Sequence, residues 1–307
     1  MSFTLPQLLN AEEFDQLDIK NPLFLLAAEE ICRKKEIPTH QLRLAGSGSL
    51  PVFLIGITHV LKFFPSLFED AFKNECSALE LLSQKNVTTP RLLDCGPLQS
   101  WHFILMTQLP GQSLKELWPQ LSSTEKQQAC SSLGQHLRQM HEITSDSPAH
   151  LSLWSAFAEK QKTNCVVIQR KKKLPEHWLN QIEPYLARVE WPPTELSFLH
   201  TEVMSDHVFF SQRRQFTGFI DFEPSMFGPR EYDFASVGLF VTAGDPAALR
   251  SFFTGYGNLE ESRRVDFRRR IMAYTLLHRY SNLNWYLQFM PKAERLEDLA
   301  DLWWGVG

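Results

Sequence analysis

The stretch LSFLHTEVMSDHVFFSQRRQFTGFIDFE, residues 196–223, decides the fold that we expect for this chain. It contains three short, mostly apolar runs with a strand-like pattern: Leu196–Leu199, Val208–Phe210 and Phe216–Ile220. Glu202 follows the first run and Asp221 follows the last, 19 residues later. Strands joined by turns at this spacing can bring both carboxylates to one end of a small sheet. Because clustered carboxylates are costly to bury, a divalent metal ion between them is the economical explanation.

Upstream of this stretch, a lysine interrupts an apolar strand pattern. Lys62 lies within Val60–Phe64, where an unpaired ammonium group would be costly to bury. Glu75, on the helix expected next, and the phosphates of a nucleotide are two candidate partners. A lysine at a strand edge, or one that extends its ammonium group to solvent, would need neither partner.

A glycine-bearing turn precedes this lysine in the chain. Gly46, Ser47, Gly48 and Ser49 lie between two expected strands. They match neither the dinucleotide fingerprint nor the Walker pattern. By themselves they therefore indicate either a phosphate-binding loop or a plain hairpin.

Composition excludes several classes of protein. The 307 residues are enough for two domains or lobes, and 43% apolar residues with 21% charged residues describe a globular chain. A net charge of −4 provides no field for nucleic acid or an anionic membrane, so we expect neither as a partner. No apolar run approaches the roughly 20 residues of a membrane-spanning helix. Five scattered cysteines and the absence of signal-peptide features in residues 1–10 predict a cytoplasmic protein.

The period of the apolar residues changes near Pro110-Gly111. Before this point, alternating and aromatic-rich segments predict five strands, with helices over residues 23–33 and 68–84. After it, long helical patterns dominate. The basic run at residues 170–173 is expected to be a solvated loop between two helices, with a phosphate or partner patch as the alternative. We therefore expect a small lobe over residues 1–109 and a larger helical lobe over residues 110–307.

The order of these features resembles the aminoglycoside and small-molecule phosphotransferase family, which has the protein-kinase-like fold. The resemblance runs from about Leu42 to Val241 and rests on an ordered set of stations: Gly46–Ser49, Lys62, Glu75, Thr107-Gln108-Leu109 with Pro110-Gly111, His200–His207 and Ile220-Asp221-Phe222. Leu133–His141 and Gly228–Ala235 add further similarity. The resemblance implies an α+β, two-lobed kinase-like fold with a mostly antiparallel small lobe.

The resemblance also implies how the donor would be bound. Lys62 would bind the phosphates of ATP or GTP, with Glu75 orienting it. The glycine-bearing turn and the hinge residues Gln108 and Leu109 would complete the nucleotide site. His207 and Asp221 would hold Mg²⁺ or Mn²⁺.

On the acceptor side, the resemblance implies that a small-molecule hydroxyl compound receives the phosphoryl group. Glu202 would accept the proton of that hydroxyl. His200 fits a residue that orders the loop better than it fits a base. Asp233 would be a structural carboxylate bonded to the backbone of the catalytic loop.

Two residues depart from the family pattern. Glu202 stands where most members have aspartate, and its extra methylene moves the carboxylate by about 1 Å, which can lower the rate 100-fold. His207 stands where an asparagine usually helps to hold the metal, and imidazole is a less natural magnesium ligand than oxygen. Both departures keep open a catalytically silent, nucleotide-binding module as an alternative function.

Two further interpretations concern other residues. His200, Glu202 and a distant histidine such as His278 have the ligand types of a non-haem iron oxygenase, which would require a β-barrel. The segment from Glu294 to Trp304 is either an acidic, aromatic wall for an aminated or sugar-like acceptor, or an amphipathic helix that packs its tryptophans into the core.

Overall fold

The computed structural model describes residues 3–46, 48–192 and 195–306, and its elements alternate between short strands and helices. The helices are α1 (Ala11–Asp15), α2 (Pro22–Lys34), α3 (Glu69–Gln84), α4 (Leu114–Leu117), α5 (Ser123–His141), α6 (Pro148–Lys171), α7 (Glu176–Arg188), α8 (Glu231–Phe240), α9 (Pro246–Tyr256), α10 (Leu259–Ser262), α11 (Val265–Leu277), α12 (Leu283–Phe289) and α13 (Leu296–Trp304). The strands are β1 (Leu42–Leu44), β2 (Val52–Ile55), β3 (His59–Pro65), β4 (Leu92–Leu98), β5 (Trp101–Thr107), β6 (Gln112–Ser113), β7 (Thr144–Ser145), β8 (Leu196–Leu199), β9 (Val208–Phe210), β10 (Phe216–Phe219) and β11 (Met226–Gly228). No helix in the described ranges is long and apolar enough to cross a membrane.

The chain forms two compact units, each described by itself. Unit 1 comprises Met1–Gly111 and Thr217–Pro224, and unit 2 comprises Gln112–Phe216 and Ser225–Gly307. The expected boundary at residues 109 and 110 differs from this division mainly because the chain returns to unit 1 at Thr217. There the Thr217 hydroxyl donates to the Pro110 carbonyl, and the Phe219 amide donates to the Thr88 carbonyl.

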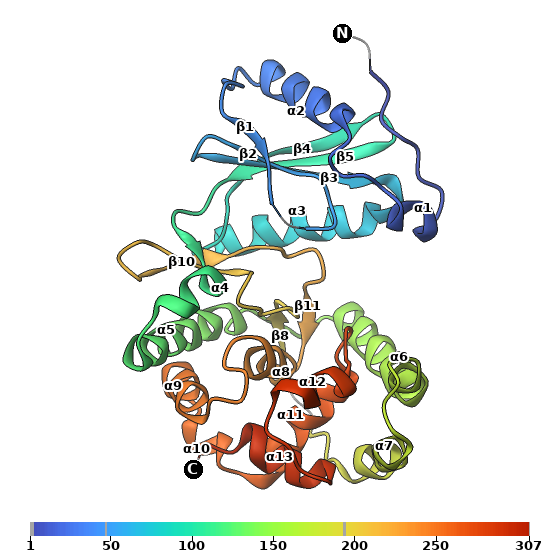
Figure 1. The fold of residues 1–307 in the computed structure, drawn as a ribbon, viewed down its shortest axis with the longest axis vertical. Helices are drawn as coiled ribbons and strands as arrows, with labels where there is room; N and C mark the ends of the chain where they lie inside the picture. Colours follow the sequence, from blue (N-terminus) through green and yellow to red (C-terminus); the bar gives the residue numbers. More distant parts are fainter. Residues whose placement is uncertain (1–2, 47, 193–194, 307) are drawn as a thin grey trace. The chain divides into compact units, whose positions relative to one another are not determined.

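Unit 1 is built on an antiparallel sheet of order β1-β2-β3-β5-β4, covered by α2 on one face and α3 on the other (Figure 1). The side chains of a strand point alternately to the two faces of its sheet, so β3 contributes residues to the core under α2 and to the core under α3. Phe63 packs toward the α2 side, with its ring 6.2 Å from that of Phe24. Phe64 packs on the α3 side, 5.9 Å from Phe72. Lys62 shares the parity of Phe64, and this parity directs its side chain toward α3.

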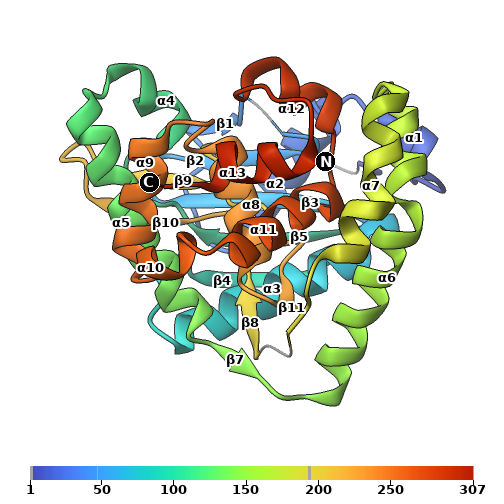
Figure 2. The ribbon, with the colours of Figure 1, turned by 90° about the horizontal axis from the view of Figure 1, so that it is seen from below.

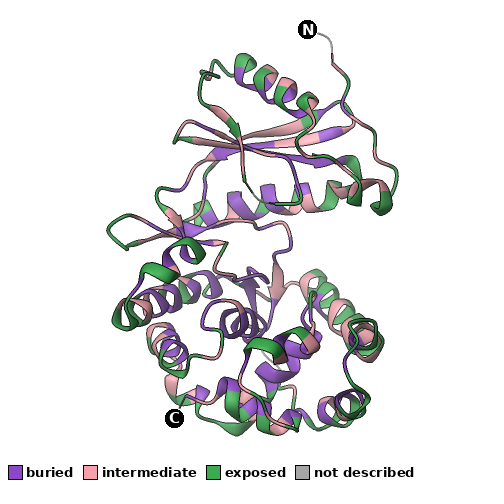
Figure 3. Ribbon diagram, in the orientation of Figure 1, coloured by how far each residue is buried: buried purple, intermediate pink, exposed green. Residues whose placement is uncertain are grey.

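Unit 2 is mostly helical, as the view from below shows (Figure 2). Its small sheet has the order β11-β8-β7 and is antiparallel. The α8 helix is buried along nearly its whole length, and the buried residues of unit 2 gather on it and on α11 (Figure 3). Helices α5 and α9 approach so closely that a Cβ atom on Gly134 would lie 2.2 Å from the Phe252 carbonyl oxygen. Only glycine permits such an approach.

The structure decides two expectations about unit 2, of which the first is wrong. β8 pairs with β7 and β11, so it does not form one small sheet with β9 and β10, the next two strands in the chain. Of the two interpretations of residues 294–304, the amphipathic helix that packs its tryptophans into the core is the one present, since Trp303 and Trp304 of α13 are buried. Asp301 on α13 pairs with Arg268 at 2.8 Å, and Glu297 pairs with Arg188 at 2.5 Å.

Candidate functional site

The lysine on β3 is the centre of a buried ionic cluster in unit 1. Its Nζ atom lies 2.8 Å from a Glu75 oxygen, 2.6 Å from an Asp221 oxygen and 3.1 Å from a Glu223 oxygen. Only 7% of Lys62 is exposed. Burial disfavours its charged form, but the three carboxylates outweigh burial and raise the pKa of Lys62 well above its ordinary value. For Glu75, burial is the larger effect and raises the pKa of its carboxyl despite the attraction of Lys62.

The segment that carries Asp221 is tied to the helix that carries Glu75. On α3, the Asn74 side-chain amide donates to the backbone carbonyl of Glu223 at 2.8 Å. Asp221 adopts a φ of 71°, a left-handed conformation that is uncommon outside glycine. One helix therefore holds both the carboxylate partner of Lys62 and the backbone beside Asp221.

Carboxylate oxygens of Glu75, Asp221 and Glu223 lie within 4.8 Å of one another. Hard oxygen donors grouped in this way fit Mg²⁺. Glu223 is a site residue to which the sequence analysis gave no role. Its position as a second carboxylate two residues after Asp221 is the available signal.

The remaining residues predicted to bind nucleotide lie on two connections of unit 1. Gly46, Gly48 and Ser49 are in the β1–β2 connection, where Gly48 has a φ of 123°; Ser47 lies outside the described residues. Gln108 and Leu109 follow β5, and the Gln108 amide donates to the Thr58 carbonyl at 2.8 Å. The Gln108 Oε1 atom is buried without a hydrogen-bond partner among the described residues.

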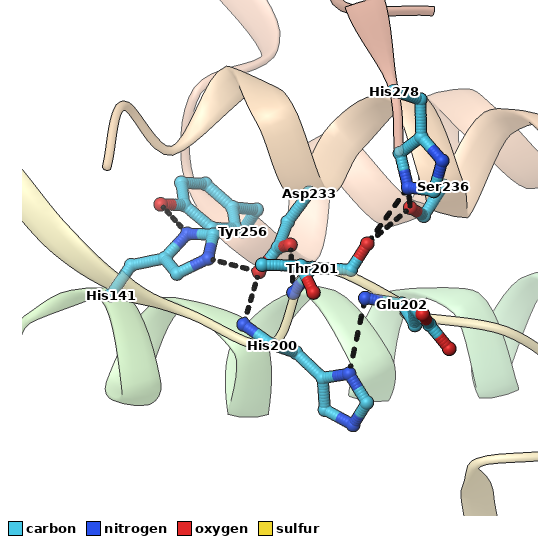
Figure 4. A network of polar contacts seen from close by, with 8 residues as sticks. All are labelled: His141, His200, Thr201, Glu202, Asp233, Ser236, Tyr256 and His278. Atoms are coloured by element: carbon cyan, nitrogen blue, oxygen red, sulfur yellow. Dashed lines mark hydrogen bonds and ion pairs between the residues drawn. The ribbon is translucent and has the colours of Figure 1, made fainter. Parts of the chain in front are cut away.

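In unit 2, Asp233 on α8 holds the backbone of the loop after β8 (Figure 4). One of its oxygens accepts from the His200 amide at 2.9 Å, and the other accepts from the Thr201 amide at 2.7 Å. His141 at the end of α5 contacts the same carboxylate at 3.0 Å, and its other ring nitrogen lies 2.8 Å from the Tyr256 hydroxyl. The carboxylate is completely buried, so its partners replace the hydrogen bonds that water would make.

Thr201 is held through both its backbone amide and its backbone carbonyl (Figure 4). Its φ of 69° is unfavourable for a β-branched residue. His278 Nε2 lies 2.8 Å from the Thr201 carbonyl oxygen, and the Ser236 hydroxyl donates to the same oxygen at 3.1 Å. Because the Tyr280 amide donates to His278 Nδ1, the ring proton belongs on Nε2. Burial lowers the pKa of His278 to about 4, so the ring is neutral at physiological pH.

The loop side chains next to this peptide are arranged by short local bonds. The Glu202 amide donates to His200 Nδ1 at 3.3 Å, which suits a histidine that orders the loop. His207 Nδ1 lies 2.9 Å from the Glu202 carbonyl oxygen. With the proton on Nδ1, Nε2 of His207 carries the lone pair that a metal ligand needs. Glu202 is 8% exposed.

The predicted site residues therefore fall into two sets. Unit 1 brings Lys62, Glu75 and Asp221 together, and unit 2 brings His200, Glu202 and His207 together. Among the described residues, no group of potential metal ligands contains His200 with His278. Instead, His278 supports the loop backbone, and the fold contains no β-barrel in the part of the chain described. The iron-oxygenase interpretation is therefore wrong.

Comparisons with known proteins identify a family and a fold for this chain. Residues 41–268 match the model of the phosphotransferase enzyme family. One similar solved structure is the GDP and kanamycin complex of APH(2")-IIia, with 15% identity, a TM-score of 0.65, and coverage of 90% of this chain and 97% of that chain. The streptomycin–ATP–APH(2")-IIa ternary complex has 18% identity, a TM-score of 0.60, and coverage of 81% and 89%. Aminoglycoside phosphotransferase APH(3'')-Id from Streptomyces rimosus, in complex with ADP and streptomycin, has 17% identity, a TM-score of 0.59, and coverage of 82% and 98%.

At these identities the structural likeness shows the fold, which is the α+β, protein-kinase-like fold that the sequence predicts. The family model adds more than the fold, because it spans most of the chain and includes Lys62, Glu75 and Asp221 of unit 1 and His200, Glu202 and His207 of unit 2. The chain belongs to the phosphotransferase enzyme family.

Proposed function

We propose that the protein transfers the γ-phosphoryl group of ATP or GTP to a hydroxyl group of a small molecule. The observation that carries this proposal is the buried Lys62 ammonium between the carboxylates of Glu75 and Asp221. A lysine held in this way is suited to the phosphates of a nucleotide. Similar structures that contain ATP, ADP or GDP, with streptomycin or kanamycin in some, support a nucleotide donor and a small acceptor.

In the proposed reaction, the acceptor oxygen forms a bond to the γ-phosphorus while the bond to the β-phosphate oxygen breaks. The hydroxyl proton passes to the Glu202 carboxylate, and the nucleoside diphosphate leaves. Because such transition states are loose, Glu202 mainly positions the hydroxyl and receives its proton late. Asp233 accepts from the Thr201 amide and His278 contacts the Thr201 carbonyl, so the backbone that leads into Glu202 is kept in one orientation.

A divalent ion, Mg²⁺ or Mn²⁺, is part of this proposal. Asp221 and Glu223 would hold it through carboxylate oxygens, and His207 through Nε2. When bound, the ion would neutralise charge on the phosphates.

Five cysteines present as free thiols, with no disulfide among the described residues, support a cytoplasmic location.

Thermal unfolding with ATP or GTP and Mg²⁺ tests the donor site. A nucleotide at 100 times its Kd stabilises a protein by about 2.7 kcal/mol, and we expect this shift in the wild type. Lys62→Met should abolish it. Lys73→Met should keep it, because Lys73 is an exposed lysine of unit 1 that pairs with Glu69. A wild type without any shift contradicts the proposal.

Phosphate transfer separates an enzyme from a silent module. Glu202→Gln should keep the nucleotide-dependent shift and lower transfer at least 100-fold, since a positioned proton acceptor contributes about 10²- to 10⁴-fold. The silent module gains support from the glutamate at position 202. It would be the better description if the wild type binds nucleotide but transfers phosphate to no acceptor.

A further inference from the structure

Unit 2 contains a cavity of about 500 Å³ that the proposed function does not use. Helices α6 and α11 form two of its walls, and residues 191–192 with the chain around the starts of β8 and α8 complete it. We call it the α6–α11 cavity. Its described lining contains none of His200, Glu202 and His207. Small-molecule sites have volumes of about 300 to 1,000 Å³, so the α6–α11 cavity is large enough to hold a ligand.

The walls of the α6–α11 cavity are mainly apolar and aromatic. Trp154 on α6 and Tyr274 on α11 are buried, and their rings are 6.1 Å apart. The Trp191 ring packs against Tyr274 at 5.2 Å, and the Lys162 ammonium group lies 4.6 Å from the Trp191 ring. Aromatic rings pack against one another in offset-stacked or edge-to-face arrangements. The walls therefore favour a ligand that contains an aromatic ring.

Two buried charged side chains in the lining have hydrogen-bonding capacity that the protein does not use. Arg270 on α11 and Glu231 on α8 are 7% and 4% exposed. Arg270 Nε donates to Glu231 Oε1 and Arg270 Nη1 donates to Asp266 Oδ2, both at 3.3 Å. Among the described residues, neither Arg270 Nη2 nor Glu231 Oε2 has a hydrogen-bond partner. Because buried charged groups are costly unless their hydrogen bonds are made, water or a ligand must supply the missing bonds.

The charges of the lining favour an uncharged ligand. Two cations and two anions line the cavity and sum to zero: Lys162, Arg270, Glu159 and Glu231. An anionic group beside Arg270 would also face Glu231, and a cationic group beside Glu231 would also face Arg270. An amide or a hydroxyl group carries a donor and an acceptor side by side. Such a group can accept from the arginine and donate to the glutamate.

Carboxylates outside the lining disfavour an anion further. Asp266 is the second carboxylate at Arg270, and Glu190 and Glu195 are exposed on either side of the 191–192 wall in the sequence. All three add to the repulsion of a negatively charged ligand. The Arg270 guanidinium still repels a cation from the position next to it.

We propose that the α6–α11 cavity is a ligand site of its own, and that it takes an uncharged aromatic molecule with an amide or hydroxyl group. The ring lies against Trp154, Trp191 and Tyr274, and the polar group accepts from Arg270 Nη2 and donates to Glu231 Oε2. The inference does not depend on the proposed function, because no residue proposed to bind nucleotide or to transfer phosphate lines this cavity.

Three probes with the same rings and different charges test the site: 2-naphthamide, 2-naphthoate and 2-naphthamidine, which are uncharged, anionic and cationic at neutral pH. Each is titrated into the ¹⁵N-labelled protein while the indole signals of the eight tryptophans are followed by NMR. The signal that is missing in Trp191→Phe belongs to Trp191. 2-Naphthamide should shift this signal with a Kd of about 1 mM or less, as expected for a ligand of this size. The charged probes should bind at least about 5-fold more weakly.

Variants of the lining locate the site and test its chemistry. Ala158→Phe fills the cavity from α6 and should weaken 2-naphthamide binding at least about 10-fold. Ala156→Phe is the matched control and should leave the Kd unchanged, because Ala156 is exposed on the same helix and lies outside the lining. Glu231→Gln removes the negative charge beside Arg270 and should shift the preference from 2-naphthamide to 2-naphthoate. This variant keeps the proposal testable if Ala158→Phe does not fold.

Three results would overturn the inference. The first is a Trp191 signal that none of the probes shifts at about 5 mM, which would mean that water alone fills the cavity. The second is equal binding of 2-naphthamide by Ala158→Phe and Ala156→Phe. The third is tighter binding of a charged probe than of 2-naphthamide by the wild type, or an unchanged preference in Glu231→Gln. No nucleotide is present in these titrations, so their failure is distinct from a failure of the proposed function.

Discussion

At the residue scale, one lysine faces more negative charge than it can neutralise. Lys62 contacts Glu75, Asp221 and Glu223, which leaves the ionised cluster with excess negative charge. This excess should repel nucleotide phosphates unless a divalent cation accompanies them. We therefore expect Glu223→Gln to bind ATP about 3- to 10-fold more tightly in EDTA, because one repulsive charge is gone. With Mg²⁺ the gain should disappear, since an oxygen ligand is also lost.

Isothermal titration calorimetry with and without Mg²⁺ measures both effects. Asp70→Asn is the control, because it removes one exposed negative charge from the same helix, α3. If Glu223→Gln and Asp70→Asn have equal affinities for ATP in EDTA, Glu223 does not act through its contact with Lys62.

His278 should make the stability of the protein sensitive to acid. Its pKa of about 4 in the folded protein lies below the ordinary 6.5, because burial disfavours the charged ring. The unfolded chain therefore takes up this proton as the pH falls through 6.5, whereas the folded protein does so only near pH 4. Stability from this source is complete above pH 6.5 and is lost as the pH falls toward 4.

The change His278→Gln isolates this effect, because a glutamine Nε2 can still donate to the Thr201 carbonyl but does not titrate. Between pH 7.5 and pH 5 the wild type should lose about 2 kcal/mol more of its free energy of unfolding than the variant. Urea unfolding at the two pH values measures the difference. Parallel losses in both proteins would show that His278 is not the group responsible.

The roles of some of these residues could be predicted from the sequence, whereas the role of His278 could not. An unpaired lysine is costly to bury in an apolar strand, so Glu75 was one candidate partner of Lys62, and the structure contains that ion pair. The contact of Asp233 with the loop amides is also present. His278 was misinterpreted because its environment is set by residues 40 to 80 positions away, such as Thr201 and Ser236. Side-chain type alone does not distinguish a metal ligand from a hydrogen-bond donor.

At the element scale, the predictable parts are those whose pattern is local. Helices expected over residues 23–33 and 68–84 are confirmed as α2 and α3. The neighbours of β8 could not be predicted, because β7 and β11 have only 2 and 3 residues. Strands this short do not show the alternation of apolar and polar residues by which a strand is recognised. Pairing between distant strands depends on the whole core rather than on the sequence of either strand.

The packing of α5 on α9 gives a prediction at this scale. Gly134→Ala would place a Cβ atom 2.2 Å from the Phe252 carbonyl oxygen and 2.7 Å from the Tyr256 nitrogen. Backbone atoms cannot move aside as side chains do, so the free energy of unfolding should fall by about 1–3 kcal/mol despite alanine's better helix propensity. Gln135→Ala, at the next and exposed position, should change stability little. Chemical denaturation measures both variants, and a more stable Gly134→Ala would contradict the close approach.

At the scale of the whole molecule, each of the two units is built from two separate stretches of the sequence. Thr217–Pro224 lies in the second half of the sequence but belongs to unit 1. The segment supplies Asp221 and Glu223 to Lys62, and a Cβ atom on Gly218 would lie 2.7 Å from the Thr88 carbonyl oxygen. This explains why a boundary placed by composition at residues 109 and 110 did not include it. Local periodicity does not record that the chain crosses between the two units three times.

Hydrogen exchange can test this membership directly. Amides that open together share one opening free energy, so amides of the unit 1 strands form one reference group and those of β8 and α8 form another. We expect the Phe219 amide, which donates to the Thr88 carbonyl, to exchange with the free energy and denaturant dependence of β3 and β5. Addition of ATP and Mg²⁺ should slow exchange in Thr217–Pro224 as much as in β3, because both carry residues of the Lys62 cluster. If Thr217–Pro224 instead opens with β8 and α8, the segment belongs energetically to unit 2, and its contacts with Lys62 contribute little to holding it.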